Sequence, residues 1–360
     1  MTHRIRVGIN GFGRIGRAIF RKNLVANIFD IVAINDINPD PSNVVYQLNY
    51  DTTYGALNPT FKVTGNQMTN GTYNFIYYKY DRIDKVPWRD HDIDLILDAS
   101  GVHQNVLAAR RLLETQPNLY VLVTHSPEEV DFTMILGANE ADFNPDKHRL
   151  ISSSICDATA LAPCMKLVDD VFGIYNGYIT TLHPWLNYQN LMDGPASSWS
   201  HPGEIYHHYA LGRAMVGNII PKPTSAVEAA CKVLKNVDIK NIGSFSYRTP
   251  LPIVCSADIT LNLRNTINKN DIITQFKKAE QKQVWRIFLN NIDPLVSSDF
   301  KQSDYSAILD HRWTDVIGGT MLKLVLWYDN EWGYASRVVD QVAYITSFAD
   351  QLKGKNETRY

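Results

Sequence analysis

The sequence predicts an α/β protein built from two domains. Its 360 residues exceed what a single hydrophobic core ordinarily organises. Before Cys156, short apolar strands alternate with helical segments, which is the pattern of a parallel sheet covered by helices. After Cys156, strands alternate apolar and polar residues, most clearly over 253–263, as half-buried antiparallel strands do. We therefore expect an α/β first domain and an α+β second domain whose sheet is mixed and largely antiparallel.

The composition excludes several classes of protein. Hydrophobic residues make up 45% of the chain, charged residues 20%, and the formal net charge is -2. These values are typical of a globular protein with a packed core, without the basic surplus that binds nucleic acid or an anionic membrane. The four cysteines form no Cys-x-x-Cys pair, and neither a signal peptide nor a membrane-spanning stretch is recognisable. We expect a cytoplasmic protein that binds no metal, nucleic acid or membrane.

A glycine-rich loop follows the first strand, 5–10, and leads into a helix at 17–22. The loop reads Gly11-Phe12-Gly13-Arg14-Ile15-Gly16. Its first glycine permits a tight turn, the second lets the backbone approach a pyrophosphate, and the third lets helix and strand pack closely. This context predicts a dinucleotide-binding Rossmann domain, with all six residues at the cofactor.

Two further strand ends are expected at the same cofactor. The strand 31–35 delivers Asp36, which stands 20 positions after Gly16. A carboxylate there accepts hydrogen bonds from an adenosine ribose and repels a 2′-phosphate, which favours NAD over NADP. The alternative is an acidic turn residue without a ligand. The strand 94–98 is followed by Ser100 and Gly101, small residues that suit a close approach of the cofactor.

Cys156 stands where an apolar strand, 149–152, turns into a helix. The positive end of a helix lowers the pKa of a cysteine, which would make Cys156 a nucleophile at the sheet edge where ligands bind. The alternative is a small buried side chain with no chemistry.

The remaining expected elements are strands at 73–77, 119–123, 132–137, 177–183 and 321–327, helices at 106–113, 164–168, 271–286 and 337–352, and a long loop at 190–216.

Several motifs in chain order closely resemble glyceraldehyde-3-phosphate dehydrogenase. They are the stretch 10–17 around the glycine loop, the stretch 152–163 around Cys156, 180–183, 218–221, and Trp327-Tyr328-Asp329-Asn330-Glu331-Trp332-Gly333-Tyr334. The resemblance implies a Rossmann NAD-binding domain over 1–155, completed by a C-terminal helix at 334–360, and a catalytic domain over 156–333. It also implies a small-molecule aldehyde substrate and a homotetramer.

The resemblance also implies roles for individual residues. Cys156 matches the family nucleophile and His183 the base that activates it. Asn330 matches the residue that holds the nicotinamide amide. Thr224 and Arg248 match positions that contact the substrate phosphate or inorganic phosphate.

The chain departs from the family pattern at its phosphate-binding positions. Ile155 and Asp157 replace residues with hydroxyl groups, Leu186 replaces a threonine, Leu211 an arginine, and Ser225 a glycine. Asp157 has two interpretations: its carboxylate disfavours the thiolate and repels phosphate, or it points away and only favours the helix dipole.

Three functions are compatible with this pattern. The first is phosphorylating oxidation of glyceraldehyde 3-phosphate, which Arg248 and Thr224 favour. The second, which we prefer, is a related NAD-dependent oxidation through a cysteine thioester, with another aldehyde, such as erythrose 4-phosphate, or with water as acyl acceptor. The third is a non-catalytic NAD-binding protein, against which the retention of both Cys156 and His183 argues.

Overall fold

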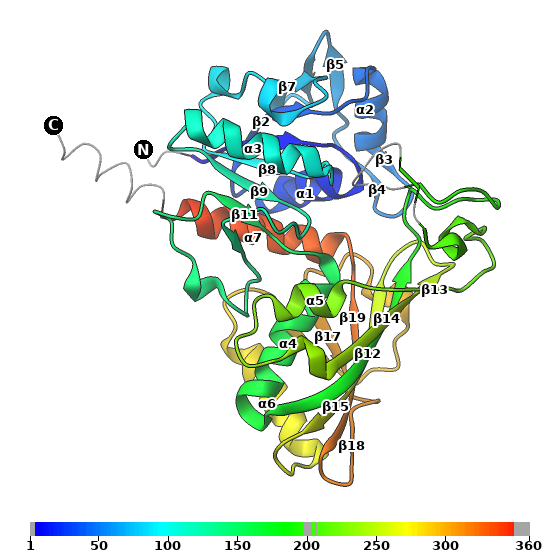
Figure 1. The fold of residues 1–360 in the computed structure, drawn as a ribbon. Helices are drawn as coiled ribbons and strands as arrows, with labels where there is room; N and C mark the ends of the chain where they lie inside the picture. Colours follow the sequence, from blue (N-terminus) through cyan, green and yellow to red (C-terminus); the bar gives the residue numbers. More distant parts are fainter. Residues whose placement is uncertain (1–3, 198–203, 206, 349–360) are drawn as a thin grey trace, which may run out of the picture. The chain divides into compact units, whose positions relative to one another are not determined.

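The computed structural model describes residues 4–197, 204–205 and 207–348 (Figure 1). The chain divides into two compact units. The first comprises 1–133, 142–153 and 338–360, and the second 134–141 and 154–337, so far as these residues are described. The domain boundaries expected from the sequence stay a prediction. Among the described residues, no helix combines the length and apolar character needed to cross a bilayer.

The first unit is organised by a nine-stranded sheet in the order β10-β11-β9-β8-β1-β2-β7-β6-β5. All neighbouring strands run parallel except the pairs β7/β6 and β6/β5. The strands are β1 (Arg6–Asn10), β2 (Asp30–Asn35), β5 (Lys62–Thr64), β6 (Gln67–Thr69), β7 (Asn74–Tyr78), β8 (Leu95–Asp98), β9 (Tyr120–Val123), β10 (Phe132–Thr133) and β11 (Leu150–Ser152); β3 (Tyr50–Asp51) and β4 (Gly55–Ala56) form a separate pair.

The helices of this unit cover the sheet with their apolar faces, which are formed by apolar residues repeating every three or four positions. They are α1 (Arg14–Ala26), α2 (Pro41–Asn49) and α3 (His103–Thr115). From α3, Val106 and Ala109 join Ile96 of β8 and Val121 of β9 in one core. Burial of this face, rather than intrinsic helix propensity, supplies most of the stability of such helices.

Three strand ends of the first unit are tied together by buried amide and carboxylate groups. Asn10, at the end of β1, faces both Asn35 of β2 and Asp98 of β8 in the register. Asn10 Nδ2 donates to Asp98 Oδ1 at 2.9 Å, and Asn35 Nδ2 donates to Asn10 Oδ1 at 2.8 Å. The loops that follow β1, β2 and β8 therefore start side by side at the carboxyl edge of the sheet.

The strand expected at 132–137 is shorter in the structure. β10 ends at Thr133, and the chain turns over 135–139. The Asn139 side chain accepts a hydrogen bond from the Ile135 amide, and Gly137 has a φ of +84°. The left-handed glycine and the side-chain bond favour a turn over a strand here.

The second unit contains a mixed eight-stranded sheet. Its order is β13-β14-β12-β15-β19-β17-β16, with β18 also beside β19. The pairs β12/β14 and β16/β17 are parallel, and the other pairs are antiparallel. The strands are β12 (Ile174–Pro184), β13 (Ile220–Lys222), β14 (Ile242–Thr249), β15 (Cys255–Leu263), β16 (Phe288–Asn291), β17 (Ala307–Asp310), β18 (Asp315–Ile317) and β19 (Met321–Tyr328).

Helices of the second unit position the nucleophile against this sheet. α4 (Cys156–Phe172) contacts β12 and β17, and α5 (Ala226–Cys231) and α6 (Lys269–Lys282) pack beside it. α6 begins with a capping box: the Asn268 side chain accepts a hydrogen bond from the Asp271 amide, and the Asp271 side chain accepts one from the Asn268 amide. The last helix, α7 (Trp332–Thr346), starts in the second unit and ends in the first; the helix expected at 337–352 extends beyond the described residues.

Candidate functional site: a nucleotide loop and a cysteine–histidine pair

The glycine loop after β1 needs glycine at its first and third glycine positions. Gly11 has a φ of +88°, and a Cβ there would lie 2.4 Å from the Ser100 amide nitrogen. A Cβ on Gly16 would lie 2.3 Å from the Gly11 carbonyl oxygen. A Cβ on Gly13 would meet no described atom within 4 Å. The loop is therefore closely packed at two glycines and open in front of Gly13.

This open position coincides with the start of α1. Gly13 precedes the helix and has no side chain with which to cap its first amides. Uncapped amides and the positive helix end favour an anionic group there. The residues thus fit the pyrophosphate of a dinucleotide.

Asp36 is placed to receive a ribose. One carboxylate oxygen accepts from the Phe12 amide at 2.6 Å, and the other accepts from the Asn38 amide at 2.9 Å. The side chain is partly exposed. Each oxygen keeps a lone pair, so the carboxylate can accept hydroxyl groups in a fixed orientation.

The other residues that the sequence predicts at the cofactor make contacts within the protein. Ser100 donates to Asp98 Oδ1 at 2.7 Å, and Gly101 follows it with a φ of +69°. The Phe12 ring is buried edge-on against Phe20, so this residue acts on Asp36 through its amide alone. The remaining members are Arg14, which forms an ion pair with Asp51 at 2.5 Å, and Ile15, which is half-buried.

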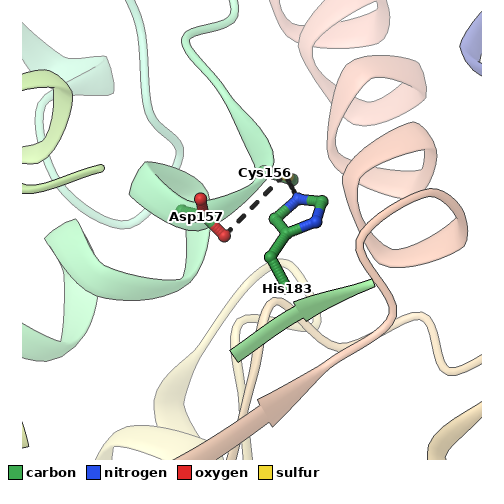
Figure 2. Close-up of side chains that lie close together, drawn as sticks. All are labelled: Cys156, Asp157 and His183. Carbon is green, nitrogen blue, oxygen red and sulfur yellow. Dashed lines mark hydrogen bonds between the residues drawn. The ribbon is translucent and has the colours of Figure 1, made fainter. Parts of the chain in front are cut away.

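In the second unit, Cys156 and His183 face one another (Figure 2). Cys156 is the first residue of α4, and His183 is the second-last residue of β12. Cys156 Sγ lies 3.8 Å from His183 Nε2. His183 Nδ1 lies 2.8 Å from the Pro184 carbonyl oxygen, which can only accept. The neutral imidazole therefore carries its proton on Nδ1 and turns the Nε2 lone pair toward the sulfur.

The surroundings favour the neutral form of both members of the pair. Burial, and secondly the Asp157 carboxylate, raise the pKa of the Cys156 thiol well above its usual value, against smaller opposing effects of backbone amides and Arg248. The lowered pKa expected from the helix end is therefore wrong, because burial outweighs the helix. Burial, and secondly the charge of Arg248, lower the pKa of His183 to about 4. A neutral imidazole beside a protonated thiol is ready to accept the thiol proton when sulfur attacks.

Asp157 points into this site. Its side chain is 7% exposed, and Oδ1 lies 4.0 Å from Cys156 Sγ (Figure 2). The Tyr328 hydroxyl, from the end of β19, donates to the same Oδ1 at 2.6 Å. Of the two interpretations of this residue, the one in which the carboxylate points away is wrong.

The strand register brings cations to the same place. His183 of β12 is the cross-strand partner of Arg248 of β14, and Arg248 is in turn the partner of Ile220 of β13. Arg248 is 7% exposed, and its Nε lacks a hydrogen-bond partner within the described part of the chain. Lys222 ends β13; burial, and secondly Arg248, lower the pKa of Lys222 to about 8.

Lys222 and Tyr328 were not found from the sequence. Tyr328 lies inside the motif 327–334 without an assigned role, no motif includes Lys222, and strand pairing brings both residues to the site. Tyr328 is the register partner of Cys255, the residue that begins β15. The sequence signals were that Lys222 directly follows the motif 218–221 and that Tyr328 is the second residue of the motif 327–334.

Other predicted residues of this unit have structural contacts. Asn330 is 4% exposed and its Oδ1 accepts from the Val254 amide at 3.1 Å, which fixes the side-chain amide. Thr224 Oγ1 accepts from the Ala226 amide at 3.2 Å, at the start of α5. The substituted position Leu211 is buried in an apolar cluster with Ala196 and Ile220, and therefore offers no charge to a ligand.

One group of donors in the described residues could hold a cation. Cys156, Asp157 and His183 each offer a ligand atom, and these atoms lie within 4.8 Å of one another. Such mixed sulfur, nitrogen and oxygen sets suit zinc. The expectation that the chain binds no metal stays a prediction.

Comparison with known proteins agrees with this arrangement. Residues 5–106 match the family model "Glyceraldehyde 3-phosphate dehydrogenase, NAD binding domain", and residues 155–330 match the model of the C-terminal domain of the same family. A glyceraldehyde-3-phosphate dehydrogenase of Kitasatospora aureofaciens is 33% identical over 95% of this chain and 99% of its own. Glyceraldehyde-3-phosphate dehydrogenase 2 of Bacillus subtilis is 31% identical over 96% and 97%, and glyceraldehyde-3-phosphate dehydrogenase 1 of Schizosaccharomyces pombe is 33% identical over 94% and 97%.

These matches cover both units and include the glycine loop and the cysteine–histidine pair. They confirm the predicted resemblance, the α/β fold class and NAD as the cofactor. The chain therefore belongs to the glyceraldehyde-3-phosphate dehydrogenase family and is an NAD-dependent oxidoreductase.

Proposed function

We propose that the chain oxidises a phosphorylated, sugar-type aldehyde through a thioester on Cys156, with a substrate or acyl acceptor different from that of the ordinary phosphorylating enzyme. The observation that carries the proposal is the Asp157 carboxylate, 4.0 Å from the nucleophilic sulfur where the family has a hydroxyl. Leu211, buried among apolar side chains in place of an arginine, supports it. Charge-assisted contacts to phosphate contribute about 1.5–3 kcal/mol each, so their loss disfavours the ordinary reaction.

The chemistry follows from the cysteine–histidine pair. His183 Nε2 accepts the thiol proton as Cys156 Sγ adds to the aldehyde carbon, which gives a thiohemiacetal. When bound, NAD supplies the hydride acceptor for oxidation of that adduct to the thioester. The glycine loop and Asp36 would hold the dinucleotide, and Asn330 would contact its nicotinamide amide.

Two cations support an anionic substrate. Arg248 is buried, and its Nε has no hydrogen-bond partner among the described residues. Lys222 lies close enough to Arg248 for the guanidinium charge to lower the pKa of the lysine. Buried guanidinium groups are favourable only when an anion or hydrogen-bond acceptor reaches them. We expect the phosphate of the aldehyde to bind here, with Thr224 as a further predicted contact.

Ordinary phosphorylating glyceraldehyde-3-phosphate dehydrogenase is the second candidate. Arg248 and the names of the relatives favour it. A non-catalytic NAD-binding protein is disfavoured, because a 3.8 Å sulfur–imidazole pair with a fixed tautomer serves no evident packing purpose.

A substrate screen separates these candidates. NADH production is measured with phosphorylated and unphosphorylated aldehydes, including glyceraldehyde 3-phosphate and erythrose 4-phosphate, each with and without inorganic phosphate. We expect turnover that does not require inorganic phosphate, or a preference for an aldehyde other than glyceraldehyde 3-phosphate. Strong phosphate-dependent turnover of glyceraldehyde 3-phosphate would establish the ordinary activity instead.

We also propose a homotetramer in the cytoplasm, as the family resemblance implies. Sedimentation equilibrium of the full chain tests the assembly: a single species of four chain masses supports it, and a stable monomer contradicts it.

A further inference from the structure

We infer that Asp157 is a catalytic base that activates water, so that the Cys156 thioester is hydrolysed and the product leaves as a carboxylate. The inference rests on the proposed function, because it requires an acyl group on Cys156. It assigns a specific acceptor, water, and a specific residue to the release step.

The distances suit an attacking water. In the thioester, the carbonyl carbon is bonded directly to Sγ, and Asp157 Oδ1 lies 4.0 Å from Sγ. A water hydrogen-bonded to the carboxylate at about 2.8 Å can stand about 3.2 Å from that carbon, within the range of a near-attack arrangement. A base must lie within one such hydrogen bond of the proton that it removes.

Tyr328 holds the carboxylate in this orientation. Its buried hydroxyl donates to Oδ1 at 2.6 Å. A carboxylate has about four lone-pair positions, so this bond leaves acceptor capacity for water. Because Tyr328 belongs to β19 and Asp157 to α4, helix and sheet together fix the base relative to the sulfur.

His183 cannot serve every step alone. Thioester formation leaves the proton of the thiol on His183 Nε2, because Nδ1 already donates to the Pro184 carbonyl. An imidazolium has no lone pair with which to activate water. While it serves as the acid that protonates the departing sulfur, His183 is not available as the base for water, and Asp157, 4.0 Å from Sγ, is placed to supply that base.

The hydrolysis balances with these two residues. The water oxygen bonds to the carbonyl carbon while Asp157 takes a proton from that water. The bond between carbon and Sγ then breaks, and His183 gives its proton to sulfur, which restores the thiol. The product acid loses a proton to solvent, and Asp157 returns its own proton to solvent.

The same carboxylate discriminates between acceptors. A phosphate dianion approaching the carbonyl carbon would come close to a like charge, whereas water is neutral and can donate to it. Ile155, where the family has a hydroxyl, removes a hydrogen bond that phosphate would use. Both substitutions disfavour phosphate, and Asp157 in addition favours water.

The test uses p-nitrophenyl acetate, which acylates a reactive cysteine without NAD or an aldehyde. Release of p-nitrophenolate by the full-length protein is followed by stopped flow, and acetyl-Cys156 by mass spectrometry. We expect a burst of one equivalent per chain, then steady turnover that inorganic phosphate does not accelerate. In Asp157→Asn we expect the burst to remain, steady turnover to fall by about 10² or more, and acetyl-Cys156 to accumulate.

Two further variants complete the experiment. Asp157→Thr restores a hydroxyl, and we expect slow hydrolysis that inorganic phosphate now accelerates; it also serves if Asp157→Asn does not fold. Asp170→Asn, on the exposed side of the same helix and paired with Lys166, is the matched control and should behave as wild type. Equal steady turnover in wild type and both Asp157 variants would overturn the role of Asp157. A wild-type protein that folds but neither releases p-nitrophenolate nor forms acetyl-Cys156 would overturn the nucleophile, and with it the proposed function.

Discussion

The cofactor loop of the first unit and the cysteine pocket of the second unit recognise their ligands by different means. The loop works mainly through the backbone: Gly11 and Gly16 set its path, and open space lies before Gly13. The pocket works through side chains, with Cys156 and His183 among charged neighbours on several elements. The loop keeps the family pattern, whereas the pocket departs from it.

The difference shows which kind of site can be altered without loss of the fold. A backbone site tolerates few substitutions, because a Cβ at Gly11 or Gly16 would overlap backbone atoms. A side-chain pocket can exchange a hydroxyl for Asp157 or an arginine for Leu211 while the strands and helices remain. Specificity can therefore change in the second unit while cofactor use stays the same.

The largest effect is expected from Cys156→Ser, which should abolish oxidation in the second unit and leave NAD binding in the first unit intact. Cys156→Ser should lower aldehyde oxidation by at least about 10³-fold, because a serine hydroxyl beside a neutral imidazole is a far weaker nucleophile than a thiolate. NADH production measures the loss, and calorimetry of NAD binding should give wild-type affinity. Activity within tenfold of wild type would contradict the assignment of the nucleophile.

The glycine loop gives a matched pair of variants. Gly11→Ala should destabilise the protein by about 2 kcal/mol or more, because alanine is strained at a φ of +88° and its Cβ meets Ser100. Gly13→Ala should change stability by less than about 0.5 kcal/mol, yet weaken NAD binding about tenfold, because its methyl group enters the space for the pyrophosphate. Urea unfolding and calorimetry measure the two effects; equal destabilisation would refute this account of the loop.

Asp36 should decide which dinucleotide is used. Asp36→Ser removes a carboxylate that accepts hydrogen bonds from the Phe12 and Asn38 amides. The substitution also removes the repulsion between this carboxylate and a 2′-phosphate. We expect the ratio of kcat/KM for NADP to that for NAD to rise about 10- to 100-fold, on the scale of one charge-assisted hydrogen bond. An unchanged ratio would mean that the cofactor preference lies elsewhere.

The smallest effect concerns thiol reactivity. Asp157 contributes to the raised pKa of Cys156, so the thiolate fraction at neutral pH is small and grows as pH rises. Asp157→Thr should move the pH profile of iodoacetamide alkylation to lower pH and speed alkylation at pH 7 about tenfold, the effect of one pKa unit. The same assay in a Cys156→Ser background measures reaction at Cys231, the other partly exposed cysteine, and provides the correction. A profile unmoved by the substitution would show that burial alone sets the pKa.

Much of the fold and part of the site could be predicted locally. The strand, glycine loop and helix at 5–22 carry their own signals, and so does the alternation over 253–263. The strand expected at 132–137 failed because apolar residues alone cannot exclude a turn, and the bond from Ile135 to Asn139 favours one. Lys222 lies outside the motifs and Tyr328 inside one, but neither could be given a role, because their positions in the site depend on strand order.

The sequence by itself predicted the glycine loop and Asp36 from spacing and residue type, which are enough where the backbone forms the site. It predicted the pairing of Cys156 with His183 only through the family resemblance. Tertiary structure alone decided the direction of Asp157. A first-turn aspartate can face either solvent or the sulfur, and the Tyr328 hydroxyl, 171 residues away in the chain, holds it toward the sulfur. Side-chain direction depends on packing between distant segments, which a linear pattern does not contain.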